Sequence, residues 1–114
     1  MGTGTISGGI LSNITSLKMG PRSTLLYGDK NSTIVVNDNF DMSTYTDIDK
    51  TAQFLVSDQG TATINASKTI KTNLKTTVSG LSGANVTNKG TIEMAGTDES
   101  VGIYLKGSTG TNET

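Results

Sequence analysis

The sequence predicts an all-β chain wound as a right-handed parallel β-helix, that is, a β-solenoid segment of about four turns. Three observations favour this fold. Only 32% of the 114 residues are hydrophobic and 4% are aromatic, which is little material for one compact core. Short segments recur at nearly constant spacing and alternate apolar with polar residues, as strands do. Apolar residues are nowhere sustained at helical spacing, while β-branched residues and glycine are frequent.

The repeat begins at four places in the chain. The segments "GTISGGI", "STIVVND", "GTATINA" and "GTIEMAG" start near residues 4, 32, 60 and 90. Two and four residues past each start the side chain is small or apolar, and the residues between are mostly polar or β-branched. The positions expected to face inward are Ile6, Gly8, Ile34, Val36, Ala62, Ile64, Ile92 and Met94. Asn, Asp and Gly precede three of the starts, so each repeat is expected to begin at a corner.

A second strand is predicted in most repeats, beginning at residues 24, 51 and 100. Alternation within these strands assigns the following side chains to the interior: Leu25, Tyr27, Ala52, Phe54, Val56, Val101, Ile103 and Leu105. Residues 38–50 fit the repeat poorly and are predicted to form an irregular loop. We therefore expect one solenoid over residues 1–107 and a ragged tail or truncation point at 108–114.

A column this short exposes unpaired strands at both ends, and neither end shows an amphipathic cap. We therefore expect the chain to be a fragment of a longer polypeptide, held by neighbouring repeats of its parent chain or by end-to-end self-association.

Composition excludes several classes of function. A net charge of −1, with scattered lysines, gives no basic face for nucleic acid. Without Cys or His there is no disulfide framework, no thiolate metal site and no imidazole base. The longest apolar runs are far below a membrane span, so direct membrane insertion is not expected. We expect no cofactor and no metal ion.

Catalysis is not predicted. A nucleophilic serine would lack a histidine base, and no "SxxK" spacing is present. Paired carboxylates could hydrolyse glycans or bind calcium, and the candidates are Asp38, Asp41, Asp47, Asp49, Asp98 and Glu99. No calcium-binding order of Asp and Gly accompanies them, so a solvated acidic loop is the simpler interpretation.

Two aromatic residues, Phe40 and Tyr45, lie in the irregular segment and are the candidate ligand-binding residues. Recognition loops commonly project from the corners of a β-helix, and exposed aromatic side chains are common anchors in interfaces. The alternative is that both rings fasten the loop to the column.

One stretch is similar to a known family. "VTNKGTIEMAGTDESVGIYLKG", residues 86–107, resembles a rung in the passengers of the large autotransporters (type Va) of fusobacteria, in which "N-x-G-x-I" is followed by "S-x-G-[IM]-Y". The matching residues are Asn88, Gly90, Ile92, Ser100, Gly102, Ile103 and Tyr104. The resemblance implies a β-helix stalk at the bacterial cell surface, secreted and anchored to the outer membrane through a C-terminal barrel absent from this chain.

The function implied by the resemblance is that of a structural and adhesive segment, a virulence component that presents loops to a host surface protein or glycan. Two alternatives remain open at this point. One is a glycan-processing β-helix such as a tailspike or polysaccharide lyase. The other is a segment of a vacuolating-toxin-like passenger.

Overall fold

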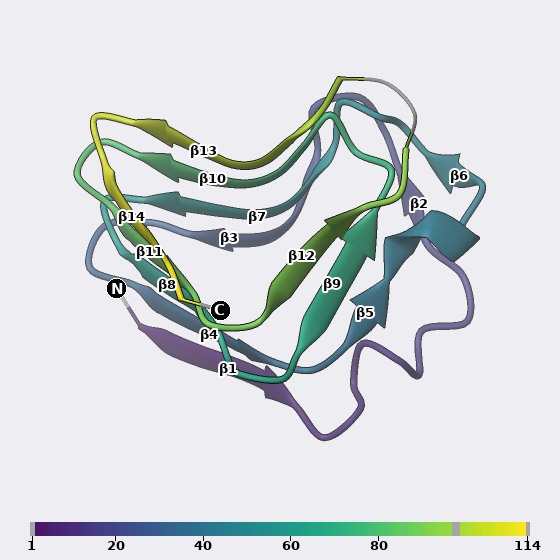
Figure 1. Cartoon of the computed structure of the whole chain (residues 1–114), viewed down its shortest axis with the longest axis horizontal. Coiled ribbons are helices and arrows are strands. Elements are labelled where there is room, and N and C mark those ends of the chain that lie inside the picture. Colours follow the sequence, from purple (N-terminus) through teal and green to yellow (C-terminus); the bar gives the residue numbers. More distant parts are fainter. Residues whose placement is uncertain (1, 97–98, 114) are drawn as a thin grey trace.

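The computed structural model describes residues 2–96 and 99–113, and it shows a β-solenoid of about four stacked turns (Figure 1). All strand pairs within these residues are parallel, and the one helix there is a 3-10 turn, η1 (Met42–Thr44). The predicted fold class is thereby confirmed, while the right-handed sense of the coil stays a prediction.

Three sheets enclose the interior (Figure 1). Sheet A contains β1 (Thr3–Ser7), β4 (Thr33–Asn37), β8 (Thr61–Ile64), β11 (Asn85–Asn88) and β14 (Thr109–Asn112). Sheet C contains β3 (Thr24–Gly28), β7 (Gln53–Asp58), β10 (Thr76–Leu81) and β13 (Val101–Lys106). Sheet D contains β5 (Phe40–Asp41), β9 (Thr69–Thr72) and β12 (Thr91–Met94). A small sheet B pairs β2 (Lys18–Met19) with β6 (Asp47–Ile48).

The coils differ in length. Sheet A aligns Thr3, Thr33, Thr61, Asn85 and Thr109 in one column. Successive coils therefore span 30, 28, 24 and 24 residues (33 − 3, 61 − 33, 85 − 61, 109 − 85). The two longer coils carry β2 and β6, so the extra residues form the additional corner of sheet B.

The predicted repeat is correct for its second and third members. Ile34 pairs with Ala62 and Val36 with Ile64, as the spacing of 28 requires. The first member is displaced by two residues, because Gly4 pairs with Ile34. Placing the fourth start at Gly90 is wrong: its strand β12 belongs to sheet D, and the strand that follows β8 in sheet A is β11.

The error has a physical cause in the corner glycines. A Cβ on Gly60 would lie 2.4 Å from the carbonyl oxygen of Ser32, and one on Gly90 would lie 2.2 Å from that of Lys68. Both glycines therefore let the chain pass close to the neighbouring turn. The Gly-Thr pair marks this type of corner. The chain uses it once before β8, a strand of sheet A, and again before β12, a strand of sheet D.

Sheet C departs from simple alternation. Ala52 and Phe54 are buried as predicted, but Leu55 is also buried in the core, so two successive side chains of β7 point inward. Val56 is aligned with Tyr27, which is 59% exposed, and the prediction that Tyr27 faces inward is wrong. The outer face of this sheet therefore carries one column that contains Tyr27, Val56, Ser79 and Tyr104.

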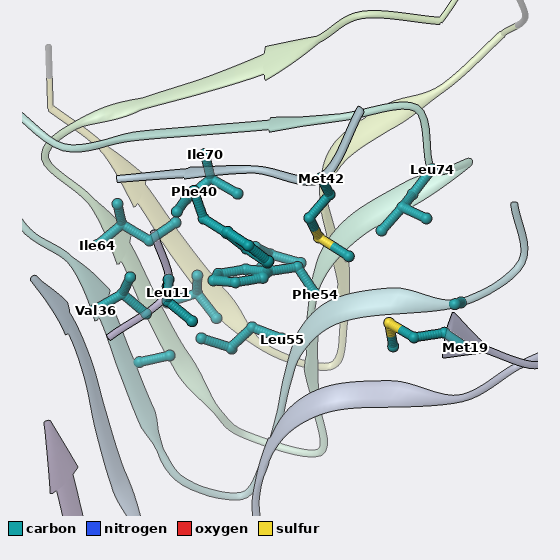
Figure 2. Packing of buried hydrophobic residues seen from close by; sticks show 14 residues of the cluster. Leu11, Met19, Val36, Phe40, Met42, Phe54, Leu55, Ile64, Ile70 and Leu74 are labelled. Carbon is teal, nitrogen blue, oxygen red and sulfur yellow. The ribbon is translucent and has the colours of Figure 1, made fainter. Parts of the chain in front are cut away.

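The hydrophobic core lies where the three sheets face one another (Figure 2). The rings of Phe40 and Phe54 meet there with centroids 6.1 Å apart, and Ile70 is fully buried beside them. Two polar residues, Thr72 and Thr77, are also buried inside. Their burial is tolerated because their Oγ1 atoms are 2.8 Å apart and form a hydrogen bond with each other. The interior is thus shared between coils.

Two boundaries predicted from the sequence need correction. Residues 38–50 are not wholly irregular, since they contain β5, η1 and β6. The segment 108–114 is not a ragged tail over its middle part, because residues 109–112 form β14 and pair with β11.

Candidate ligand-binding groove

A groove of about 640 Å³ opens on the flank of the column, beside β5 and β9. Sheet D begins at β5, whereas sheet A already has β1 one coil earlier, so the chain before β2 has no strand beneath β5. Residues 8–17 instead form a loop that provides the opposite wall of the groove. The lining residues are Leu11, Ser12, Ile14, Asn39, Phe40, Asp41, Thr44, Tyr45, Thr69 and Lys71.

The wall formed by this loop is fixed by Asp38. Its buried carboxylate accepts a hydrogen bond from the N–H of Gly9 at 2.9 Å and another from the N–H of Leu11 at 3.1 Å. The Leu11 side chain is buried in the core (Figure 2). Asp38, a candidate acid in the sequence, therefore has a structural role here, because both of its oxygens are occupied by main-chain donors.

The other wall is shaped by η1. Asp41 caps this helix, since its carboxylate accepts a hydrogen bond from the N–H of Ser43 at 2.9 Å. The turn ends at Tyr45, whose hydroxyl donates to the carbonyl oxygen of Ile14 at 2.5 Å. This bond joins the two walls at one end of the groove.

The two predicted binding residues lie together, with ring centroids 5.9 Å apart. Tyr45 is half-buried and lines the groove, while its hydroxyl is bonded to the carbonyl oxygen of Ile14. Phe40 is 3% exposed, so it contributes little more than an edge and belongs mainly to the core. Both rings also fasten the loop, as the alternative interpretation expected, and the two roles are compatible at Tyr45.

Charged and amide groups complete the groove. Asp41, Lys71 and Glu93 are aligned across sheet D, and the Lys71 ammonium lies 3.3 Å from the Glu93 carboxylate. Asn39 borders the same opening and accepts a hydrogen bond from the N–H of Thr69 at 2.9 Å. The groove thus offers one ring, one ammonium, one carboxylate and several hydroxyl groups to a ligand.

The remaining candidate acids do not converge on it. Asp47 is exposed and lies 4.0 Å from the Lys18 ammonium. Asp49 accepts hydrogen bonds from the side chain and N–H of Thr51, and these, with the Lys75 charge, lower the pKa of Asp49. Glu99 is exposed, and Asp98 lies outside the described residues. Over residues 2–96 and 99–113 no three His, Cys, Asp or Glu residues gather as metal ligands would.

Sequence reasoning missed the residues that make this a groove. Leu11, Ile14 and Lys71 are distant in sequence from Tyr45 and carry no motif. A usable signal was the departure of residues 8–17 from strand alternation, which indicated that one coil lacks its strand in sheet D.

The fold and groove define the class of this protein as a parallel β-solenoid with a lateral groove. Comparison with protein-family models, with curated proteins and with solved structures found no match to the chain. In the part of the chain that the structure describes, none of the helical segments is long and apolar enough to cross a bilayer.

Proposed function

We propose that this solenoid is a structural and adhesive segment of a surface-exposed autotransporter passenger from a bacterium, and that it presents the lateral groove to a host glycan or surface protein. The column supplies rigidity, because each strand is hydrogen-bonded to strands of adjacent coils. Affinity would come from many weak contacts along an extended surface.

The observation that carries this proposal is the position of the groove. It opens at the place where the coil departs from regular stacking, and a β-helix can accommodate such an excursion without disturbing the sheets. The half-buried ring of Tyr45 and the Lys71 ammonium, which both line the groove, suit a hydroxyl-rich ligand, since an aromatic ring packs against apolar C–H groups while charged groups bind hydroxyls.

The test uses the 114-residue chain with immobilised mammalian glycans and, separately, with immobilised fibronectin and collagen. Tyr45→Ala and Lys71→Met should each weaken binding at least about tenfold, which corresponds to about 1.4 kcal/mol. Tyr27→Ala removes a tyrosine from the outer face of sheet C and serves as the matched control, which should leave binding unchanged.

Tyr45→Phe keeps the ring and removes the bond to Ile14, so it separates contact with the ligand from support of the loop. Failure of the wild-type chain to bind any probe would contradict the proposal. Cleavage of a bound glycan would instead support a glycan-processing β-helix.

A further inference from the structure

Sheet D carries a row of three charged side chains from three successive coils. Asp41 on β5, Lys71 on β9 and Glu93 on β12 occupy the same register position, and the three strands lie side by side (Figure 1). Neighbouring positions in such a row are about 4.8 Å apart along the column. The row contains two carboxylates and one ammonium, so it bears one net negative charge.

The ammonium of this row is already paired. Among the described residues that line the groove, Lys71 is the one cation, and its Nζ lies 3.3 Å from the Glu93 carboxylate. Behind the opposite wall, the buried carboxylate of Asp38 adds another negative charge. A ligand carboxylate or sulfate would therefore lose hydration on entering the groove without meeting an unpaired cation.

The same row suits uncharged hydroxyl groups. The Oδ1 of Asp41 accepts hydrogen bonds from the N–H and the hydroxyl of Ser43, while its Oδ2 makes no hydrogen bond within residues 2–96 and 99–113. An ammonium group has three N–H donors, so Lys71 can donate to a ligand as well as to Glu93. A hydroxyl both donates and accepts. Two neighbouring sugar hydroxyls can thus bind the Asp41 carboxylate and the Lys71 ammonium together.

The groove has little apolar surface for a protein anchor. Leu11 and Phe40 line it, but each is only 3% exposed, and this leaves Ile14 and the ring of Tyr45, both half-buried. Interfaces between proteins depend on well-packed apolar and aromatic anchors. The exposed lining residues are polar: Ser12, Asn39, Asp41 and Thr44. One ring among many hydrogen-bonding groups favours a sugar, whose C–H groups pack against the ring.

We propose that the groove binds an uncharged glycan and selects against sugars that carry a carboxylate or a sulfate. The inference rests on the proposed function and narrows its ligand from a glycan or surface protein to one chemical class. Selection against acidic sugars follows from the charge of the row, and the preference for a glycan follows from the scarcity of exposed apolar surface.

The experiment uses the 114-residue chain and immobilised mammalian glycans in matched pairs, each the same oligosaccharide with and without a terminal sialic acid. The uncharged member of a pair should bind at least about tenfold more tightly, the size expected when about 1.4 kcal/mol separates two ligands. In 1 M salt, where the screening length is about 3 Å, the difference should shrink.

Two substitutions move the charge of the row without removing its shape. Glu93→Gln leaves Lys71 without its ion-pair partner and should reduce the preference for the uncharged member. Adding Asp41→Asn, which keeps a side chain suited to capping η1, gives the row a net positive charge and should abolish or reverse the preference. Asp47→Asn is the matched control: it removes one exposed carboxylate from the Lys18 pair in sheet B and should leave the preference unchanged. Circular dichroism checks that each variant is folded.

Equal or tighter binding of the sialylated glycans by the wild-type chain would overturn the inference and leave the proposed function standing. Binding to fibronectin or collagen without binding to any glycan would do the same. An equal response to Asp47→Asn and Glu93→Gln would also overturn it, because the net charge of the whole chain would then be the cause. Absence of binding to every probe would instead contradict the proposed function itself.

Discussion

The carboxylate of Asp38 and the main-chain N–H of Leu11 form a buried hydrogen bond of 3.1 Å between residues 27 positions apart in the sequence. Through this bond, and its companion to Gly9, one side chain determines the course of the loop that forms a wall of the groove. The groove therefore depends on a residue that does not line it.

Replacing Asp38 with Ala should lower the free energy of unfolding by about 2–4 kcal/mol, because two main-chain donors lose charged acceptors in a buried place. Hydrogen exchange of the Gly9 and Leu11 amides should accelerate more than that of sheet C. Asp47→Ala is the control: its ion pair is exposed, and the expected change is below about 1 kcal/mol. Equal losses in the two variants would contradict the role assigned to Asp38.

The corner glycines give a second prediction. Gly60→Ala and Gly90→Ala should each lower the free energy of unfolding by about 1–3 kcal/mol. The reason is that the added Cβ meets a main-chain carbonyl, which cannot move without disturbing its coil. Gly4→Ala should have little effect, because a Cβ there would meet nothing within 4 Å. Urea denaturation of the three variants measures the difference, and a tolerated alanine at residue 60 would show that the turns are not held in close contact.

Gln59 should respond in the opposite direction. It occupies the corner between sheets C and A with φ = 66°, a left-handed conformation that is costly for a residue with a Cβ. Glycine takes this left-handed conformation readily, and Gly107 does so with φ = 60° after the last strand of sheet C. Gln59→Gly should therefore raise the free energy of unfolding by about 0.5–1 kcal/mol. This is the difference between the backbone strain that the glycine relieves and the larger conformational entropy that it loses on folding. Gln53→Gly, within β7, should lower it, and a loss in both variants would contradict the argument.

Acid should weaken the protein partly through Asp49. Hydrogen bonds from Thr51 lower its pKa in the folded state below the ordinary 3.8. The folded state thus binds this proton less readily than the unfolded state, and the resulting stability is present above pH 3.8 and is lost as the pH falls through the folded pKa. Asp49→Asn should make the unfolding free energy less dependent on pH in this range. An unchanged pH profile would show that other carboxylates account for acid sensitivity.

The repeat was predictable where apolar side chains alternate, as in β4 and β8, because burial of one face imposes a period of two. β10 and β11 could not be found in this way. Thr77 is buried but polar, and it is stable inside because it shares a hydrogen bond with Thr72, which a linear pattern cannot reveal. Phe40 and Tyr45 were predicted as candidates from their loop, but the division of their roles depends on neighbours in another coil.

The shortening of the coils from 30 to 24 residues has a consequence for how such a chain can change. The two wide coils hold the additional corner and most of the groove, while Thr69 and Lys71 of the first narrow coil complete its lining. Since each coil contacts its immediate neighbours, a 24-residue unit beyond residue 84 could be duplicated by recombination while the groove kept its shape. The length of the column and the specificity of its groove can therefore evolve separately.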